Sequence, residues 1–122
     1  YTYTSDQSYS LLEAANTANY VMGAGTASGA NTNTNDCGLA YGHAYSILAA
    51  FTMDSTKMVL LRNPWGTTTY SGDWKHDDSS WTDALVAQVP HGIDPRTSNV
   101  DGIFAMPFTT FIDTSQTCIS SF

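Results

Sequence analysis

The sequence is poor in basic residues and has no long hydrophobic run. Its 122 residues include only four Lys and Arg against eleven Asp and Glu, which gives a net charge of −7. Such a chain has no cationic surface to neutralise phosphates or anionic lipid, so nucleic acids and membrane surfaces are not expected partners. The longest apolar runs, at 47–51 and 58–61, are far shorter than the about 20 residues that a membrane-spanning helix requires. We therefore expect no membrane span.

Cysteine is also scarce. Cys37 and Cys118 are too few for a framework of several disulfides, and the sequence contains no Asn-x-Ser/Thr glycosylation signal. Nothing in the sequence therefore marks a secreted protein, and we expect two inert thiols, with a bridge between them left open. The first residue is Tyr1 and no signal-peptide pattern follows it, so we expect a mature product or an internal fragment.

Hydrophobic residues make up 42% of the chain, enough for the core of one domain over residues 1–122. Residues 23–36 are rich in Gly, Ala, Ser, Thr and Asn and have no apolar anchor, which predicts a flexible surface loop. The other predicted elements are, in order, a short helix at 10–15, a brief strand at 20–22, a buried hairpin of strands 43–53 and 57–62, helical turns at 82–89, a late strand at 102–108 and a closing turn at 109–112. Strands dominate, so we predict an α+β fold with an antiparallel sheet or half-barrel and short helices.

His43 opens the first strand of the predicted hairpin, whereas His76 and His91 lie in polar turns and are expected to be solvated. A single histidine in an apolar strand is commonly structural, with its ring bonded to a backbone carbonyl. None of the histidines and cysteines has the spacing of a zinc site. Whether His43 is structural or functional thus depends on the side chains that contact it.

Asn63 ends the second strand, twenty positions after His43. Opposed residues of an antiparallel hairpin point to the same face, so the imidazole and the carboxamide can touch if the register allows it. A tight turn centred near Ser55 would leave them about four positions out of register, or about 13 Å apart. Contact therefore requires a longer loop or a bulge within 50–56.

If the two side chains meet, the chemistry is specific. The amide oxygen of Asn63 accepts from one ring N–H of His43 and leaves the other ring nitrogen free to serve a thiol, which is the second half of a Cys-His-Asn arrangement. Trp65 follows Asn63 by two positions and either covers this hydrogen bond or simply fills core beside Pro64.

Four motifs together resemble the calpain family of cysteine proteases. They are Gly-His-Ala-Tyr-Ser at 42–46, Arg-Asn-Pro-Trp-Gly at 62–66, Gly-x-Trp followed by a second Trp at 72–81, and Asp-Gly-x-Phe-x-Met-x-Phe-x-x-Phe at 101–111. Their order and spacing match the family over about 12–112. The Asn-Pro-Trp-Gly and Asp-Gly-x-Phe patterns favour calpains over other papain-type proteases.

The resemblance implies a papain-like fold split into two subdomains, with the nucleophilic cysteine on the first and the histidine and asparagine on the second. This chain resembles the second, β-rich subdomain alone, with His43 as general base, Asn63 as its orienter and Trp65 as a shield. The nucleophile of papain-type enzymes precedes the histidine by about 130–150 residues, whereas only 42 residues precede His43. Cys37 does not begin a predicted helix and is a poor nucleophile candidate. We therefore expect the thiol to come from a Cys-bearing first subdomain, in cis or in trans, and the chain alone to cleave nothing.

The resemblance also implies calcium dependence and protein or peptide substrates. Asp101 matches an acidic position of the family, and Asp77 lies beside His76, which occupies another. Ile103 and Thr69 replace two further acidic residues. Because Ca²⁺ takes six to eight oxygen ligands, Asp101 and Asp77 form only an incomplete candidate site, and a solvated acidic turn is the alternative.

Two other functions remain open. A non-catalytic calpain-like module of a larger assembly would keep the fold and the surface without the chemistry. A small secreted β-rich binding domain would explain the polar, weakly charged surface but would leave the motifs at 42–46 and 62–66 as coincidence. The family resemblance itself favours an intracellular protein.

Overall fold

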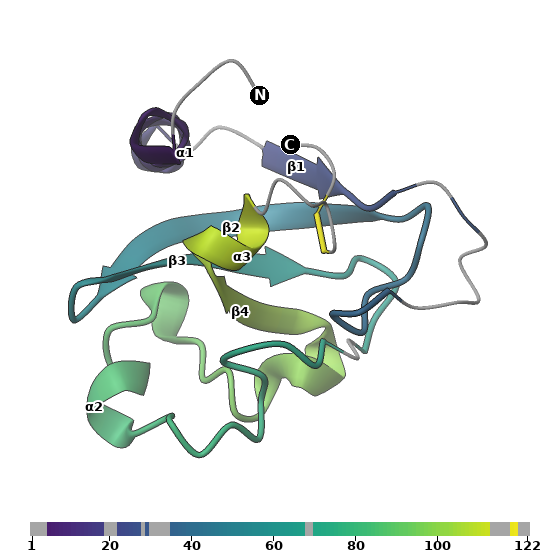
Figure 1. The fold of residues 1–122 in the computed structure, drawn as a ribbon. Helices are drawn as coiled ribbons and strands as arrows, with labels where there is room; N and C mark the ends of the chain where they lie inside the picture. Colours follow the sequence, from purple (N-terminus) through teal and green to yellow (C-terminus); the bar gives the residue numbers. More distant parts are fainter. Residues whose placement is uncertain are drawn as a thin grey trace.

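A four-stranded antiparallel sheet forms the centre of the fold, with its strands in chain order (Figure 1). The computed structural model describes residues 5–18, 22–27, 29, 35–67, 70–112 and 118–119. The strands are β1 (Met22–Gly25), β2 (Ala44–Met53), β3 (Thr56–Arg62) and β4 (Ile103–Pro107). The helical segments are α1 (Ser5–Thr17), α2 (Asp83–Val86), α3 (Phe108–Phe111) and the 3₁₀ turns η1 (Pro90–Gly92) and η2 (Ser98–Asp101). The predicted strand-dominated α+β class is confirmed.

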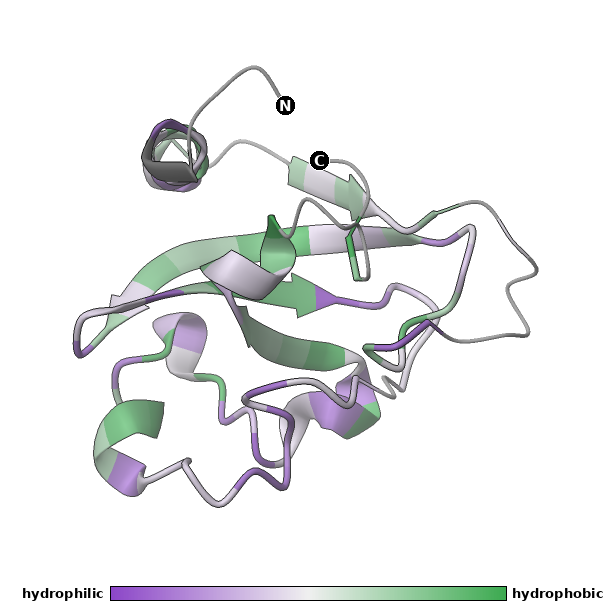
Figure 2. Ribbon diagram, viewed as in Figure 1, coloured by the Kyte–Doolittle hydropathy of each residue, from purple (hydrophilic) through white to green (hydrophobic). Residues whose placement is uncertain are grey.

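The sheet has an apolar core on each face. Helices α1 and α3 cover one face, and the segment between β3 and β4, including α2, covers the other (Figure 1). The run at 58–61 of β3 is buried on both sides because alternate residues point into the two cores, and Figure 2 shows the hydrophobic character of β3 and β4. The first core is built mainly from Tyr9, Leu12, Tyr45, Ile47, Ala50, Val59, Leu61, Phe104, Met106, Phe108 and Phe111. The second is built mainly from Ala49, Phe51, Met53, Met58, Leu60, Trp81, Val89 and Ala105.

Strands β2 and β3 form the predicted hairpin. Met53 pairs with Thr56, so the turn has only two central residues, Asp54 and Ser55, with φ angles of 50° and 116°. Gln88 holds this turn, because its Oε1 accepts from the Asp54 N–H (2.8 Å) and its Nε2 donates to the Asp54 carboxylate (3.0 Å). The hairpin is therefore tight, with no longer loop at its tip.

Several boundaries differ from the sequence-based expectation, most of all those of helix α1 and strand β1. Helix α1 begins at Ser5 rather than at 10, and strand β1 extends through Gly25, into the range 23–36 expected to be a loop. Gly and Ala have low strand propensity, and β1 forms because β2 offers it an edge, with Met22 paired to Ile47 and Gly25 to Ala44. Residues 20–21, 28 and 30–34 lie outside the described residues. No helix within the described ranges is long and apolar enough to cross a bilayer.

Candidate active site

His43 and Asn63 are in direct contact. His43 immediately precedes β2 and is only 5% exposed, and Asn63 immediately follows β3. The Nε2 atom of His43 lies 2.7 Å from Oδ1 of Asn63. The imidazole also packs edge-on against two aromatic rings, with centroids 4.8 Å away in Tyr45 and 4.2 Å away in Trp65. The predicted contact between the imidazole and the carboxamide is confirmed.

A β-bulge in β2 sets the register that allows this contact. On the turn side of the bulge Ala49 pairs with Leu60, whereas on the other side Ile47 pairs with Leu61, so Leu48 is the extra residue. Continuing the register beyond Ser46↔Arg62 places Asn63 across from residue 45. His43 lies two residues farther along, on the same face, at a diagonal distance that long side chains can span.

This geometry corrects one part of the sequence-based argument. The bulge lies at 47–49, outside the expected range 50–56, and the turn is not lengthened. Without the bulge, the register at Met53↔Thr56 would place Asn63 across from Ser46, whose side chain points away from the face of His43. One inserted residue therefore decides whether the side chains of His43 and Asn63 lie on the same face of the sheet.

The amide of Asn63 is held in one orientation. Its Oδ1 also accepts from the backbone N–H of Trp65 (3.0 Å), and its Nδ2 donates to the carbonyl of Thr67 (3.4 Å). Because Oδ1 only accepts, the Nε2 atom of His43 carries the hydrogen. Nδ1 of the neutral imidazole is then the proton acceptor of this site.

The rings that flank His43 are uncharged near neutral pH. Burial raises the pKa of the Tyr45 hydroxyl, and a hydrogen bond from the Ala40 N–H acts in the opposite direction. Trp65 is 72% exposed, which rules out the alternative that it fills core beside Pro64. Its ring packs edge-on against that of His43, and its shielding role stays a prediction.

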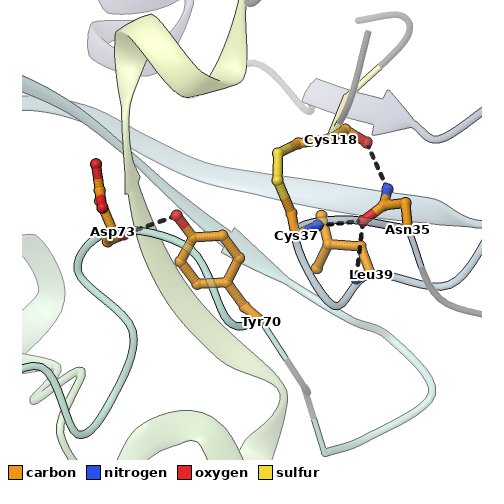
Figure 3. The surroundings of a disulfide bond; sticks show 6 residues. All are labelled: Asn35, Cys37, Leu39, Tyr70, Asp73 and Cys118. Carbon is orange, nitrogen blue, oxygen red and sulfur yellow. Dashed lines mark hydrogen bonds between the residues drawn. A yellow bond between two sulfur atoms is a disulfide. The ribbon is translucent and has the colours of Figure 1, made fainter.

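The two cysteines form a disulfide between Cys37 and Cys118, with Cα atoms 5.4 Å apart. The open question of a bridge is thus answered, and the expectation of two free thiols was wrong. Asn35 joins the same region: its Oδ1 accepts from the N–H groups of Cys37 and Leu39, and its Nδ2 donates to the Cys118 carbonyl (Figure 3). Since these are the only cysteines of the chain, no thiol remains to pair with His43.

The candidate calcium ligands do not form a recognisable site. Asp77 makes an exposed ion pair with Lys75 (3.6 Å), and Asp101 is exposed at the end of η2. No three His, Cys, Asp or Glu side chains in the described part of the chain gather around a common point. The donor set does not fit a Ca²⁺ ion, and we assign no step to calcium. His76 and His91 are both exposed.

Two residues that contact the site were not predicted from the sequence to do so. Thr26 hydrogen-bonds the backbone of His43, but it lies in the segment expected to be a loop, where no pattern singles it out. Gly102 accepts a hydrogen bond from the Asn63 N–H (2.8 Å) and packs against the same turn. Its place in the Asp-Gly motif was a signal, but the motif alone does not say what the glycine touches.

The comparisons with known proteins agree with the motifs. The family model for calpain family cysteine proteases matches residues 2–119. The chain is 33% identical over 93 residues to the calpain-type cysteine protease ADL1 of Oryza sativa subsp. japonica, covering 75% of this chain and 4% of that protein. It is 32% identical over 97 residues to calpain-5 of Caenorhabditis elegans, covering 63% and 15%. A third relative is the calpain-2 catalytic subunit of Mus musculus, at 33% over 78 residues, covering 61% and 11%. The chain thus spans only a small part of the length of these relatives, and it belongs to the calpain family of cysteine proteases.

Proposed function

We propose that this chain is the His/Asn half of a calpain-like cysteine endopeptidase and that its nucleophilic thiol comes from a Cys-bearing subdomain, in cis or in trans. The observation that carries the proposal is the 2.7 Å contact between His43 Nε2 and Asn63 Oδ1. It leaves Nδ1 as a basic atom of fixed direction, while the disulfide removes both cysteines of the chain from consideration as nucleophile.

In the proposed reaction, Nδ1 of His43 takes the proton of the incoming thiol, which gives a thiolate and an imidazolium. The thiolate attacks the carbonyl carbon of a peptide bond. When the tetrahedral intermediate collapses, the C–N bond breaks and the proton passes from Nδ1 to the leaving amine. The same nitrogen then takes a proton from water as the water oxygen attacks the thioester carbon. The C–S bond breaks, the acid product leaves, and the proton returns from Nδ1 to the sulfur.

Asn63 and Trp65 support this cycle without bonding the substrate. Oδ1 of Asn63 accepts from Nε2–H in both protonation states of the imidazole, so the ring keeps its orientation while the proton moves at Nδ1. The indole of Trp65 covers the solvent side of the imidazole and limits the access of water to this hydrogen bond. The expected substrates are proteins or peptides.

The test is to assay the chain on an unfolded protein substrate, first alone and then with a Cys-bearing calpain subdomain fused before it or added in trans. We expect no cleavage by the chain alone and turnover after addition. His43→Ala should lower turnover by about 100-fold or more because the general base is lost. His76→Ala, which changes an exposed histidine, is the matched control and should keep full turnover.

Two results would contradict the proposal. One is turnover by the isolated chain that is sensitive to thiol-directed inhibitors, since the chain holds no free thiol. The other is an assembled protease whose His43→Ala variant matches the unaltered enzyme.

The alternative is a non-catalytic calpain-like module of a larger assembly. It is favoured by the incomplete acidic set, in which Ile103 and Thr69 stand where the family has carboxylates. Stable association with a Cys-bearing subdomain but no turnover, with His43 and Asn63 unchanged, would support this alternative over the enzyme.

A further inference from the structure

Thr26 lies directly after β1 and continues the pairing of that strand with β2. The last ladder pair is Gly25 with Ala44, so the next residue pair in register is Thr26 with His43. The backbone N–H of Thr26 donates to the His43 carbonyl at 3.0 Å. In return, the His43 N–H donates to the Thr26 side-chain hydroxyl, Oγ1, at 2.9 Å. Both backbone polar groups of His43 are therefore bonded to one residue.

The hydroxyl of Thr26 also closes the loop that leads into His43. Oγ1 donates to the carbonyl of Ala40 at 2.6 Å, which is shorter than its 3.3 Å distance to the His43 carbonyl. One oxygen atom thus joins the two ends of the segment 40–43. Gly42 within it is held as well, because its N–H donates to the Ala27 carbonyl at 2.7 Å. The backbone at His43 is fixed from the β1 side, and its ring is fixed from the β3 side by Asn63.

We infer that Thr26 is a positioning residue for His43: its hydroxyl sets the backbone from which the imidazole reaches Asn63. The catalytic consequence rests on the proposed function, whereas the geometric claim does not. Valine has nearly the shape of threonine but neither donates nor accepts, so Thr26→Val leaves the His43 N–H and the Ala40 carbonyl without this partner. The hydroxyl then no longer joins the two ends of the segment 40–43, and the backbone that carries the imidazole is no longer held in one position.

The test compares three variants of the full 122-residue chain. Thr26→Val removes the hydroxyl, Thr26→Ser keeps it, and Thr56→Val makes the same exchange at an exposed strand residue. NMR measures hydrogen exchange at the His43 backbone N–H and at its ring Nε2–H, and urea unfolding measures global stability. We expect Thr26→Val to speed exchange at both hydrogens by about tenfold beyond any change in global stability, the factor that matches loss of one hydrogen bond. Thr26→Ser and Thr56→Val should exchange like the unaltered chain.

Unchanged exchange at the ring N–H of a folded Thr26→Val variant would overturn the inference. If that variant does not fold, the unaltered chain and Thr26→Ser decide: an unprotected His43 amide in the unaltered chain, or a Thr26→Ser variant with tenfold faster exchange, would overturn it equally. In the assembled protease, we expect Thr26→Val to lower kcat with KM unchanged and Thr26→Ser to restore kcat. A protected and Thr26-dependent His43 in a chain that never supports turnover would refute the proposed function and leave the positioning role standing.

Discussion

Gly102 offers the sharpest test of how the Asn63 turn is held. This glycine ends η2 with a φ of +81°, and its carbonyl accepts the hydrogen bond from the Asn63 N–H at 2.8 Å. A Cβ atom built on Gly102 would lie 2.6 Å from the carbonyl oxygen of Asn63 and closer still to that of Gly66. Both neighbours are backbone atoms, so no side-chain rotation can relieve the overlap. Gly102→Ala must therefore displace the turn that presents Asn63 to His43.

Gly92 is the matched control, because it has a similar φ of +66° but no atom within 4 Å of the added Cβ. Gly92→Ala should cost only the penalty for an L-residue in the left-handed region, about 1–2 kcal/mol. Gly102→Ala adds the overlap and a weakened hydrogen bond, about 2 kcal/mol more. For a chain of this size we expect Tm to fall by about 5 °C in the first variant and by about 15 °C in the second.

Thermal and urea unfolding measure these losses, and NMR reports whether the ring N–H of His43 still exchanges slowly. Only Gly102→Ala should speed that exchange, since only it moves Asn63. Equal losses of stability in the two variants, or a His43 ring that is unaffected in Gly102→Ala, would refute the argument that close backbone packing positions the turn.

Three further predictions concern the shield, the disulfide and the buried tyrosine. Trp65→Ala should change the free energy of unfolding by less than about 1 kcal/mol because the indole is mostly exposed, yet it should speed hydrogen exchange at the His43 ring. The control Val100→Ala, at another exposed apolar residue, should leave both the stability and the exchange at the His43 ring unchanged. Replacing both cysteines by serine opens a link between residues separated by 81 positions and should lower the free energy of unfolding by about 4 kcal/mol in urea titrations. Burial, and then the charges of two nearby aspartates, raise the pKa of Tyr70, so the folded chain keeps this hydroxyl protonated. Its contribution to the free energy of unfolding should therefore be fully present below pH 10 and be lost as the pH rises above 10. The alkaline loss of stability should be less steep in Tyr70→Phe. A Tyr70→Phe variant with the same alkaline loss would contradict this assignment.

Local sequence patterns determined much of the architecture. The apolar run at 58–61 and the turn residues at 54–56 predicted the buried hairpin, because strand propensity and turn chemistry act over a few neighbouring residues. Thr82 caps α2, because its side-chain hydroxyl accepts from the Leu85 N–H, and threonine is a residue type that favours this position. His43 and Asn63 were singled out for the same reason: their motifs are contiguous and carry recognisable chemistry.

The tertiary structure alone decided how these pieces meet. The bulge at Leu48 places His43 and Asn63 on the same face of the sheet. The residues of one strand do not specify where its pairing register with the neighbouring strand shifts by one. The Cys37–Cys118 bond and the contact of Thr26 with His43 join segments that are distant in sequence and whose composition indicated only a loop or an inert thiol. The sequence by itself determined which side chains can carry the chemistry, because residue type and motif are local. Their distance and orientation were decided by long-range pairing, because register and closure depend on contacts that no short segment contains.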